Sequence, residues 1–178
     1  MGSRRHLRAL RGLSALILAV LLSGCGLTQS VKKGAGSVTR AIFYKKVDTL
    51  QLQLAARSAL NTDEAQMSSP VEVRIWPLRK TTAFTQAAYG ALLKQDAATL
   101  AADLSGRALS VRVLPGNTTT VNIPLADDVQ AVAVAAFFLY PDMQRDSWRL
   151  TLSRDDMVAD RPAIIELNNR ELRIRGRE

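Results

Sequence analysis

The sequence predicts a mostly β protein, an antiparallel β-sandwich of seven to eight short strands with one small helical insertion between strands two and three. Three observations predict this class. Apolar and polar residues alternate with a period of two along most of the chain from residue 47 onward, and only residues 81–105 carry helical spacing. The chain of 178 residues is also long enough to bury one sizeable core.

The first four strands follow from alternation and from turn residues. Alternating runs at residues 50–54 and 71–76 predict strands one and two. Runs at 109–113 and 121–125 flank Pro115-Gly116-Asn117, a combination typical of a tight turn, and they predict a hairpin. We expect this hairpin to lie opposite to the connection between strands one and two.

The remaining strands comprise one continuous apolar run and three shorter runs. Residues 129–140 are apolar on both faces, as in a central strand, and a Pro-Asp pair stops them. Residues 148–152 alternate again. Residues 164–167 and 172–174 close the domain around an Asn168-Asn169 turn.

The helical insertion is predicted from one apolar stripe. Thr81 or Thr82 can cap the start of the first helix, and a second short helix is expected from Asp96 to about Gly106. The stripe occupies positions i, i+3, i+4, i+7 and i+8 on one helix face, at Phe84, Ala87, Ala88, Ala91 and Leu92.

The formal net charge of +8 comes from the start of the chain. Residues 1–46 hold nine of the 24 Lys and Arg and no acid, so residues 47–178 carry 15 basic against 16 acidic side chains. A near-neutral domain has no electrostatic footprint for nucleic acid, and we expect no such partner. His6 and Cys25 also precede residue 47, which excludes His-based triads, Cys nucleophiles, zinc sites and disulfides from the domain.

The first 25 residues have the pattern of a lipoprotein signal. Four arginines precede a mainly apolar stretch of ten residues, Leu13–Leu22, which is half the length of a membrane-spanning helix. The run ends in Leu22-Ser23-Gly24-Cys25, which resembles the lipobox of bacterial lipoproteins. Small residues at 23 and 24 let the backbone enter the transferase and peptidase active sites. We therefore expect residues 1–24 to be a cleaved signal peptide.

The mature chain is then expected to begin at Cys25, with S-diacylglycerol and an N-acyl group attached. Several acyl chains together give stable membrane attachment. The residue after the cysteine is Gly26, whereas an Asp at this position would resemble an inner-membrane retention signal. By similarity to lipoprotein sorting in Gram-negative bacteria, we expect the protein at the periplasmic leaflet of the outer membrane. Residues 25–46 are expected to form this lipidated N-terminus and a flexible tether, and residues 47–178 the sandwich domain.

The remaining candidates for catalysis are pairs of adjacent carboxylates. Adjacent residues on a strand point to opposite faces, and in loops such pairs usually solvate a turn. A calcium site would use Asp155, Asp156 and Asp160, but the glycine of calcium loops is absent. We expect no enzyme activity, no metal and no cofactor besides the covalent lipid. The pairs are Asp63-Glu64, Asp127-Asp128 and Asp155-Asp156.

The connection between the first two strands, residues 57–69, spans thirteen residues and is long for such a link. It mixes polar groups with Leu60 and Met67, which a solvent loop does not need. Leu60 can either pack in the core or belong to a binding loop, and the pattern leaves both open. The polar side chains expected to be exposed are Asn61, Asp63, Glu64 and Gln66.

Three stretches carry a recognisable signature: Leu60-Asn61-x-Asp63, Pro70-Val71-x-Val73-Arg74-Ile75-x-x-Leu78-Arg79, and Phe84-x4-Tyr89-x2-Leu92. Together with the lipobox they resemble the TssJ (SciN/VasD) family, the outer-membrane lipoprotein of the type VI secretion system. The resemblance covers residues 50–104 well and continues loosely through 113–116 and 137–138. The family often has Gly three residues after the aspartate, where this chain has Gln66.

The resemblance implies a transthyretin-like sandwich without enzyme activity. It also implies an adaptor of the TssJ–TssL–TssM complex, because family members hold the periplasmic C-terminal part of TssM, an inner-membrane protein. The partner loop of the family joins strands one and two. Here it maps onto Ala59, Leu60, Asn61, Thr62, Asp63, Glu64, Ala65, Gln66, Met67, Ser68 and Ser69. The alternative is another lipoprotein binding module facing the periplasm, either a pilotin or a carrier of a small apolar ligand.

Overall fold

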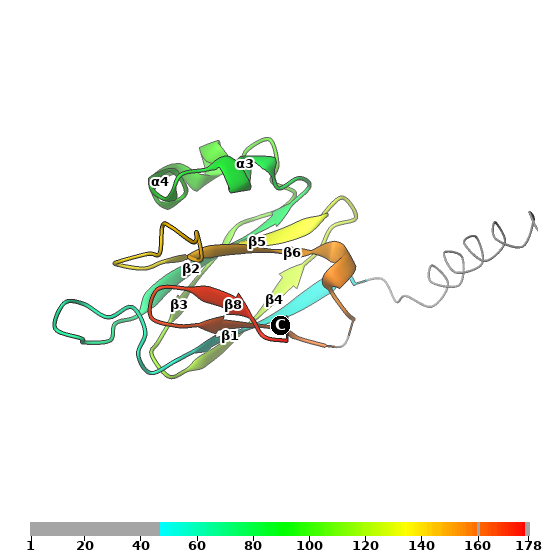
Figure 1. The fold of residues 1–178 in the computed structure, drawn as a ribbon. Helices are drawn as coiled ribbons and strands as arrows, with labels where there is room; N and C mark the ends of the chain where they lie inside the picture. Colours follow the sequence, from blue (N-terminus) through cyan, green and yellow to red (C-terminus); the bar gives the residue numbers. More distant parts are fainter. Residues whose placement is uncertain (1–46, 160, 177–178) are drawn as a thin grey trace, which may run out of the picture. The chain divides into compact units, whose positions relative to one another are not determined.

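The computed structural model describes residues 47–159 and 161–176. The predicted signal peptide (1–24) and the lipidated tether (25–46) with Cys25 lie outside these residues. Within them, eight strands form two four-stranded sheets, and two helices lie between the second and third strands (Figure 1). The elements are β1 (Thr49–Ala56), β2 (Val71–Leu78), α3 (Thr82–Gln86), α4 (Tyr89–Thr99), β3 (Leu109–Val113), β4 (Thr118–Pro124), β5 (Ala131–Phe137), β6 (Arg149–Ser153), the 3-10 turn η2 (Arg154–Asp156), β7 (Ala163–Leu167) and β8 (Leu172–Ile174).

The core lies between the two sheets, whose strand orders are β4-β1-β7-β8 and β3-β2-β5-β6. Every second side chain of β1, Leu50, Leu52 and Leu54, is fully buried there. Burying one such side chain contributes about 1.5–3 kcal/mol to folding. β5 lies between β2 and β6 and is buried on both faces, as the continuous apolar run predicts. The predicted mostly β sandwich is confirmed.

One strand pair departs from the antiparallel expectation. β1 runs antiparallel to β4 but parallel to β7, with Leu52 opposite Ala163 and Ala56 opposite Leu167. Parallel neighbours need a crossover connection, and here the chain passes through the whole second sheet between β1 and β7. Alternation reports which face of a strand is buried but not the direction of the strand, so the pattern could not show this pair.

The predicted hairpin of strands three and four is wrong. β3 pairs with β2, with Val113 opposite Val71, whereas β4 pairs with β1 in the other sheet, with Thr118 opposite Ala55. Two neighbouring runs joined by a tight turn can therefore belong to different sheets of a sandwich.

The tight turn itself is present at residues 115–117. Gly116 has φ +73, the left-handed conformation that glycine adopts without steric cost, and Asn117 donates to the carbonyl of Leu114 at 3.2 Å. The Gly116 N–H also bonds the Arg57 carbonyl, and the Ala56 N–H bonds the Asn117 carbonyl. The turn thus lies beside the start of the β1–β2 connection, and its expected place opposite to that connection is also wrong.

The helical insertion consists of two helices that break elsewhere than predicted. Ala87 and Ala88 are extended, with ψ of 136° and 152°, so α3 ends at Gln86 and α4 begins at Tyr89. The predicted second helix start at Asp96 corresponds instead to a kink inside α4, where Gln95 has φ −150°. The apolar stripe is therefore shared by two helices.

Arg149 of β6 binds the end of α3. Its guanidinium donates to the carbonyls of Phe84, Thr85 and Ala87 at 2.6–3.0 Å. These carbonyls lie at the end of the helix, where they have no partner within the helix and need an external donor. Thr81 occupies the N-cap position without a side-chain cap.

Tyr89 joins α4 to the end of β5. Its hydroxyl donates to the Phe138 carbonyl at 2.7 Å, and its ring packs edge-on against Trp148 and Phe137. Burial raises the pKa of Tyr89 to about 12. β5 ends at Phe137, three residues before the predicted end at Tyr140, so the residues that follow are free to form a loop.

Candidate functional site

Three connections meet at one end of the sandwich: the β1–β2 loop (residues 57–70), the β5–β6 loop (138–148) and the β7–β8 turn (168–171) (Figure 1). Asn61 joins all three. Its peptide N–H donates to the Asn169 carbonyl at 3.0 Å, and its side-chain oxygen accepts the N–H of Leu139 at 2.7 Å. The β1–β2 loop is therefore one part of a surface built from three segments.

Leu60, whose role the sequence left open, is a core residue. Its side chain is fully buried within the hydrophobic cluster between the sheets. Its carbonyl accepts the N–H of Ser69 at 3.1 Å, which closes the base of the loop. Leu60 thus fixes the loop to the domain, and its side chain offers no surface to a partner.

Asn61 is buried rather than exposed, so that expectation is wrong. Only 5% of the residue is accessible, and its φ of +47° is a left-handed conformation that Asn tolerates better than most residues. Its side-chain NH₂ donates to the Ser69 hydroxyl and the Pro70 carbonyl, both at 3.0 Å. A buried amide with all these partners acts as a structural link between loops.

Thr62 is buried in the same way, against the β7–β8 turn. The Asn169 side-chain oxygen accepts both the peptide N–H of Thr62, at 2.7 Å, and its hydroxyl, at 2.9 Å. The sequence assigned Asn169 only to a turn. Its bonds to two successive loop residues depend on contacts across more than 100 positions, which no local pattern reveals.

The tip of the loop is a closed turn held by Asp63. The carboxylate of Asp63 accepts the N–H of Met67 at 2.8 Å, and its peptide carbonyl accepts the N–H of Gln66 at 3.1 Å. Gln66 has φ +61°, again the left-handed region that favours glycine. The backbone at this position therefore has the conformation for which the glycine of the family, implied by the resemblance, is suited.

Six residues of the predicted partner loop are solvent-exposed, and Met67 is 66% accessible. Asp63 and Ser69 are half-buried, and Leu60, Asn61 and Thr62 are buried. The exposed members are Ala59, Glu64, Ala65, Gln66, Met67 and Ser68. They form the part of the loop that can contact another molecule.

The β5–β6 loop adds exposed apolar side chains that the sequence placed in a strand or left unassigned. Leu139, Tyr140 and Met143 are 57%, 48% and 57% accessible. The Tyr140 hydroxyl lies 3.5 Å from the carboxylate of Glu64, so the two loops are neighbours at their surface as well as at their base. The only sequence signal was an apolar run that continued up to a Pro-Asp pair.

Asp142 fixes the next turn of this loop. Its carboxylate accepts the peptide N–H groups of Gln144 and Arg145 and forms an ion pair with the Arg145 guanidinium at 2.6 Å. These bonds from Arg145 hold the pKa of Asp142 below its ordinary value. Asp142 therefore stays ionised and shapes the loop.

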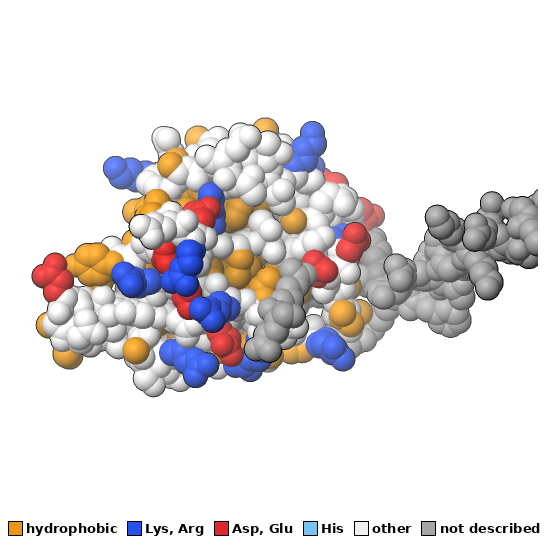
Figure 2. Space-filling view, in the orientation of Figure 1, with side chains coloured by type: hydrophobic (Ala, Val, Ile, Leu, Met, Phe, Trp, Pro, Cys, Tyr) orange, Lys and Arg blue, Asp and Glu red, His pale blue; other side chains and the backbone are white. Residues whose placement is uncertain are grey.

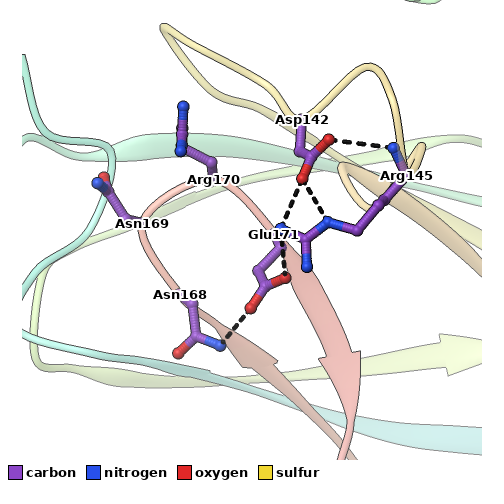
Figure 3. Close-up of a pocket in the computed structure, with 6 residues that line it drawn as sticks. All are labelled: Asp142, Arg145, Asn168, Asn169, Arg170 and Glu171. Atoms are coloured by element: carbon purple, nitrogen blue, oxygen red, sulfur yellow. Dashed lines mark hydrogen bonds and ion pairs between the residues drawn. The ribbon is translucent and has the colours of Figure 1, made fainter.

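Two open hollows flank Arg170 of the β7–β8 turn. One, of ≈ 460 Å³, is lined by residues of the β1–β2 loop together with Tyr140 and Asn169. The other, of ≈ 210 Å³, lies toward Asp142 and Glu171, and Figure 3 shows these acids engaged with Arg145 and Asn168 while Arg170 stands apart. Within the described residues Arg170 makes no ion pair.

The carboxylate pairs singled out in the sequence do not gather. In the described ranges no three His, Cys, Asp or Glu side chains are placed to hold a metal ion. Asp155 and Asp156 belong to the short turn η2, and Asp160, the third member of the candidate calcium set, lies outside the described residues. No helix in the part of the chain that the structure describes has the length and apolar character needed to cross a membrane.

The model of the type VI secretion lipoprotein family (VasD, EvfM, TssJ) matches residues 48–174. The chain belongs to this family. The resemblance stated from the sequence is thereby confirmed. No protein of the curated set matches the chain.

Solved structures with the same fold come from type VI secretion systems. A chain of the structure described as "Type VI membrane complex" is 37% identical, with a TM-score of 0.68 over 72% of this chain and 98% of that one. A chain of the structure described as "T6SS protein TssM C-terminal domain (869-1107) from EAEC" is 34% identical, with a TM-score of 0.66 and the same coverage. The lipoprotein TssJ1 of Pseudomonas aeruginosa is 26% identical, with a TM-score of 0.62 over 73% and 96% of the two chains.

Proposed function

We propose that this type VI secretion lipoprotein is a lipid-anchored adaptor of the outer membrane that binds the periplasmic C-terminal part of TssM. Through TssM it would connect to TssL at the inner membrane. The observation that carries the proposal is the match to a chain of the structure described as the TssM C-terminal domain. The two chains are 34% identical, and the match covers 98% of that chain. The similar chain from a type VI membrane complex supports the same role.

The proposal assigns one task to each part of the chain. Acylated Cys25 anchors the protein in the periplasmic leaflet, and residues 25–46 provide reach. Within the β1–β2 loop, residues Ala59 to Ser69 provide the partner contact. Leu60, Asn61 and Thr62 hold this segment in shape, and the exposed residues from Glu64 to Ser68 touch TssM. None of these tasks requires catalysis, so we propose that the protein is not an enzyme.

The hollows of the site favour a protein partner over a small apolar ligand. The hollow beside the β1–β2 loop is open and lined mainly by polar and charged residues, among them Asp63, Glu64 and Arg170. A carrier of an apolar ligand needs an apolar cavity that encloses the ligand. Polar rims with a few exposed apolar side chains are typical of protein interfaces.

Titration calorimetry with the periplasmic C-terminal part of TssM tests the proposal. We expect the full chain in detergent to bind and the triple variant Glu64→Ala, Met67→Ala, Ser68→Ala to bind at least tenfold more weakly, about 1.4 kcal/mol. Its melting temperature should be unchanged, because these side chains are exposed. Absence of binding by the wild type would refute the adaptor role.

A matched control changes exposed residues at the other end of the strands. Asp155 and Val158 lie between β6 and β7, and Val158 is 49% accessible. The double variant Asp155→Ala, Val158→Ala should bind TssM like the wild type. If the control loses affinity and the loop variant does not, the loop is not the partner site.

A further inference from the structure

We infer that the TssM-binding surface extends from the β1–β2 loop onto the β5–β6 loop and the β7–β8 turn. Leu139, Tyr140 and Met143, together with Met67, form an apolar patch that receives apolar side chains of TssM, and Arg170 pairs with a carboxylate beside them. This inference rests on the proposed function and names the chemistry of the partner segment.

The first observation is the distribution of exposed apolar side chains over the fold. Seven large hydrophobic residues are exposed among the described residues, and four of them lie on these two neighbouring loops. The other three lie singly on separate elements, at Leu93, Leu114 and Val158. Figure 2 shows hydrophobic side chains beside acidic and basic ones at this end of the molecule. Apolar patches with a polar rim mark protein interaction sites.

The second observation is that the backbone beneath the patch is fixed. Asn61 holds the N–H of Leu139, Tyr89 holds the carbonyl of Phe138, and the Ser147 carbonyl accepts the N–H of Leu172 at 2.7 Å. Side chains displayed from a fixed backbone lose less entropy when a partner binds, so more of the contact energy appears as affinity. Tyr and Met are also enriched at interfaces.

The third observation concerns charge. The acids around Arg170 have other contacts. Asp63 binds the Met67 N–H, Asp142 binds Arg145, and Glu171 binds Arg173 at 2.8 Å. Glu64, which lines the same hollow as Arg170, lies 3.5 Å from the Tyr140 hydroxyl. Arg170 itself makes no ion pair with any described residue and stands between the two hollows. A guanidinium in this position fits a carboxylate of the partner, which it can bind with two parallel hydrogen bonds.

The test measures TssM binding by the full chain with Leu139→Ser and Met143→Ser combined. We expect at least tenfold weaker binding and an unchanged melting temperature, whereas Leu93→Ser combined with Val158→Ser, exposed apolar residues elsewhere, should bind like the wild type. If the wild type binds TssM and the patch variant binds equally well, this inference is overturned while the adaptor role stands. If the wild type does not bind, both fail.

A second measurement does not depend on loss of affinity. A Met143→Cys variant carries the single thiol of the domain and can be labelled with a polarity-sensitive dye, and its emission should shift to the blue when TssM is added. The same label at Val158→Cys should not respond. If TssM binds the labelled Met143→Cys protein and the emission of the dye does not shift, the inference that the patch contacts TssM is overturned.

The charged part of the inference has its own variant. Arg170→Glu should weaken TssM binding at least tenfold, because it places like charges together. Arg107→Glu makes the same change of charge at an exposed position just before β3, at the end of that strand away from the β1–β2 loop. This control variant should bind TssM like the wild type. If the Arg170→Glu variant binds TssM as tightly as the wild type, the inference that Arg170 pairs with a carboxylate of TssM is wrong.

Discussion

The side-chain oxygen of Asn61 accepts a hydrogen bond from the peptide N–H of Leu139, 78 residues later in the chain, at 2.7 Å. The same amide group donates to Ser69 and Pro70 within its own loop. One buried side chain thus sets the distance between the loop proposed to bind TssM and the loop that carries the apolar patch. The shape of this surface depends on a residue that a partner does not touch.

Replacing Asn61 by Ala should lower the free energy of unfolding by about 1–3 kcal/mol, because the N–H of Leu139 and the Ser69–Pro70 segment lose their partner. TssM binding should weaken as well, since both loops are released. Urea unfolding and calorimetric titration measure the two effects.

The Asn61→Gly variant separates the hydrogen bonds from the backbone conformation. Glycine adopts the φ of +47° without steric cost but cannot replace the amide. It should therefore unfold at a urea concentration between those of the wild type and Asn61→Ala. A glycine variant as stable as the wild type would show that the amide bonds contribute nothing.

Gln66 gives a prediction about the tip of the loop. Its φ of +61° is costly for residues with a Cβ, and most costly for β-branched ones. Gln66→Gly should keep or raise the free energy of unfolding by up to about 1 kcal/mol, and Gln66→Val should lower it by about 1–2 kcal/mol. Equal stability of the two variants in urea would contradict the left-handed conformation.

Tyr89 predicts a loss of stability at high pH. Its pKa is raised from 10.0 to about 12, so the folded state favours the neutral phenol more than the unfolded state does. This contribution is complete below pH 10 and is lost as the pH rises toward 12. Tyr89→Phe cannot ionise, so its free energy of unfolding should fall less between pH 9 and 11.5 than that of the wild type. Parallel slopes would contradict the assignment.

Membrane attachment should depend on Cys25. A Cys25→Ser change removes the only thiol of the chain, so the protein should lose its membrane association while the sandwich stays folded. Sucrose-gradient fractionation and circular dichroism report the two properties. A Cys25→Ser protein that remains with the outer membrane would exclude the lipid anchor.

Sorting should depend on the next residue. Gly26→Asp introduces the residue that resembles an inner-membrane retention signal, so the lipidated protein should move to the inner-membrane fraction. A Gly26→Asn variant is the matched control without the charge and should remain at the outer membrane. If the Gly26→Asp protein is found in the outer-membrane fraction, residue 26 does not determine sorting.

The strands and the family could be predicted from the sequence because their signals are local. Leu50, Leu52 and Leu54 alternate along the chain, and alternation is what burial of one strand face requires. Residues 129–140 likewise have the pattern of a central strand, because both faces are apolar. Its end was misplaced because Leu139 and Tyr140 are apolar but exposed, and composition alone does not distinguish a core residue from an interface residue.

The remaining features depend on contacts between distant residues. Alanines favour helix, yet the chain is extended at Ala87, whose carbonyl accepts a hydrogen bond from Arg149, 62 residues later. Asn61 is polar and was expected on the surface, but its partners on two other loops bury it. Turn residues 115–117 bend the chain without indicating which sheet each flanking strand joins.

The position of β1 has a mechanical consequence. β1 follows the tether in sequence, lies between β4 and β7, and leads directly into the β1–β2 loop. If lipid holds one end and TssM the other, tension between the two membranes acts along β1, roughly perpendicular to its hydrogen bonds to both neighbours. Under such shear the bonds of both ladders must break together rather than one after another, and the strand would also have to pull Leu50, Leu52 and Leu54 out of the core. The path of the force would then run along a strand that is paired on both sides.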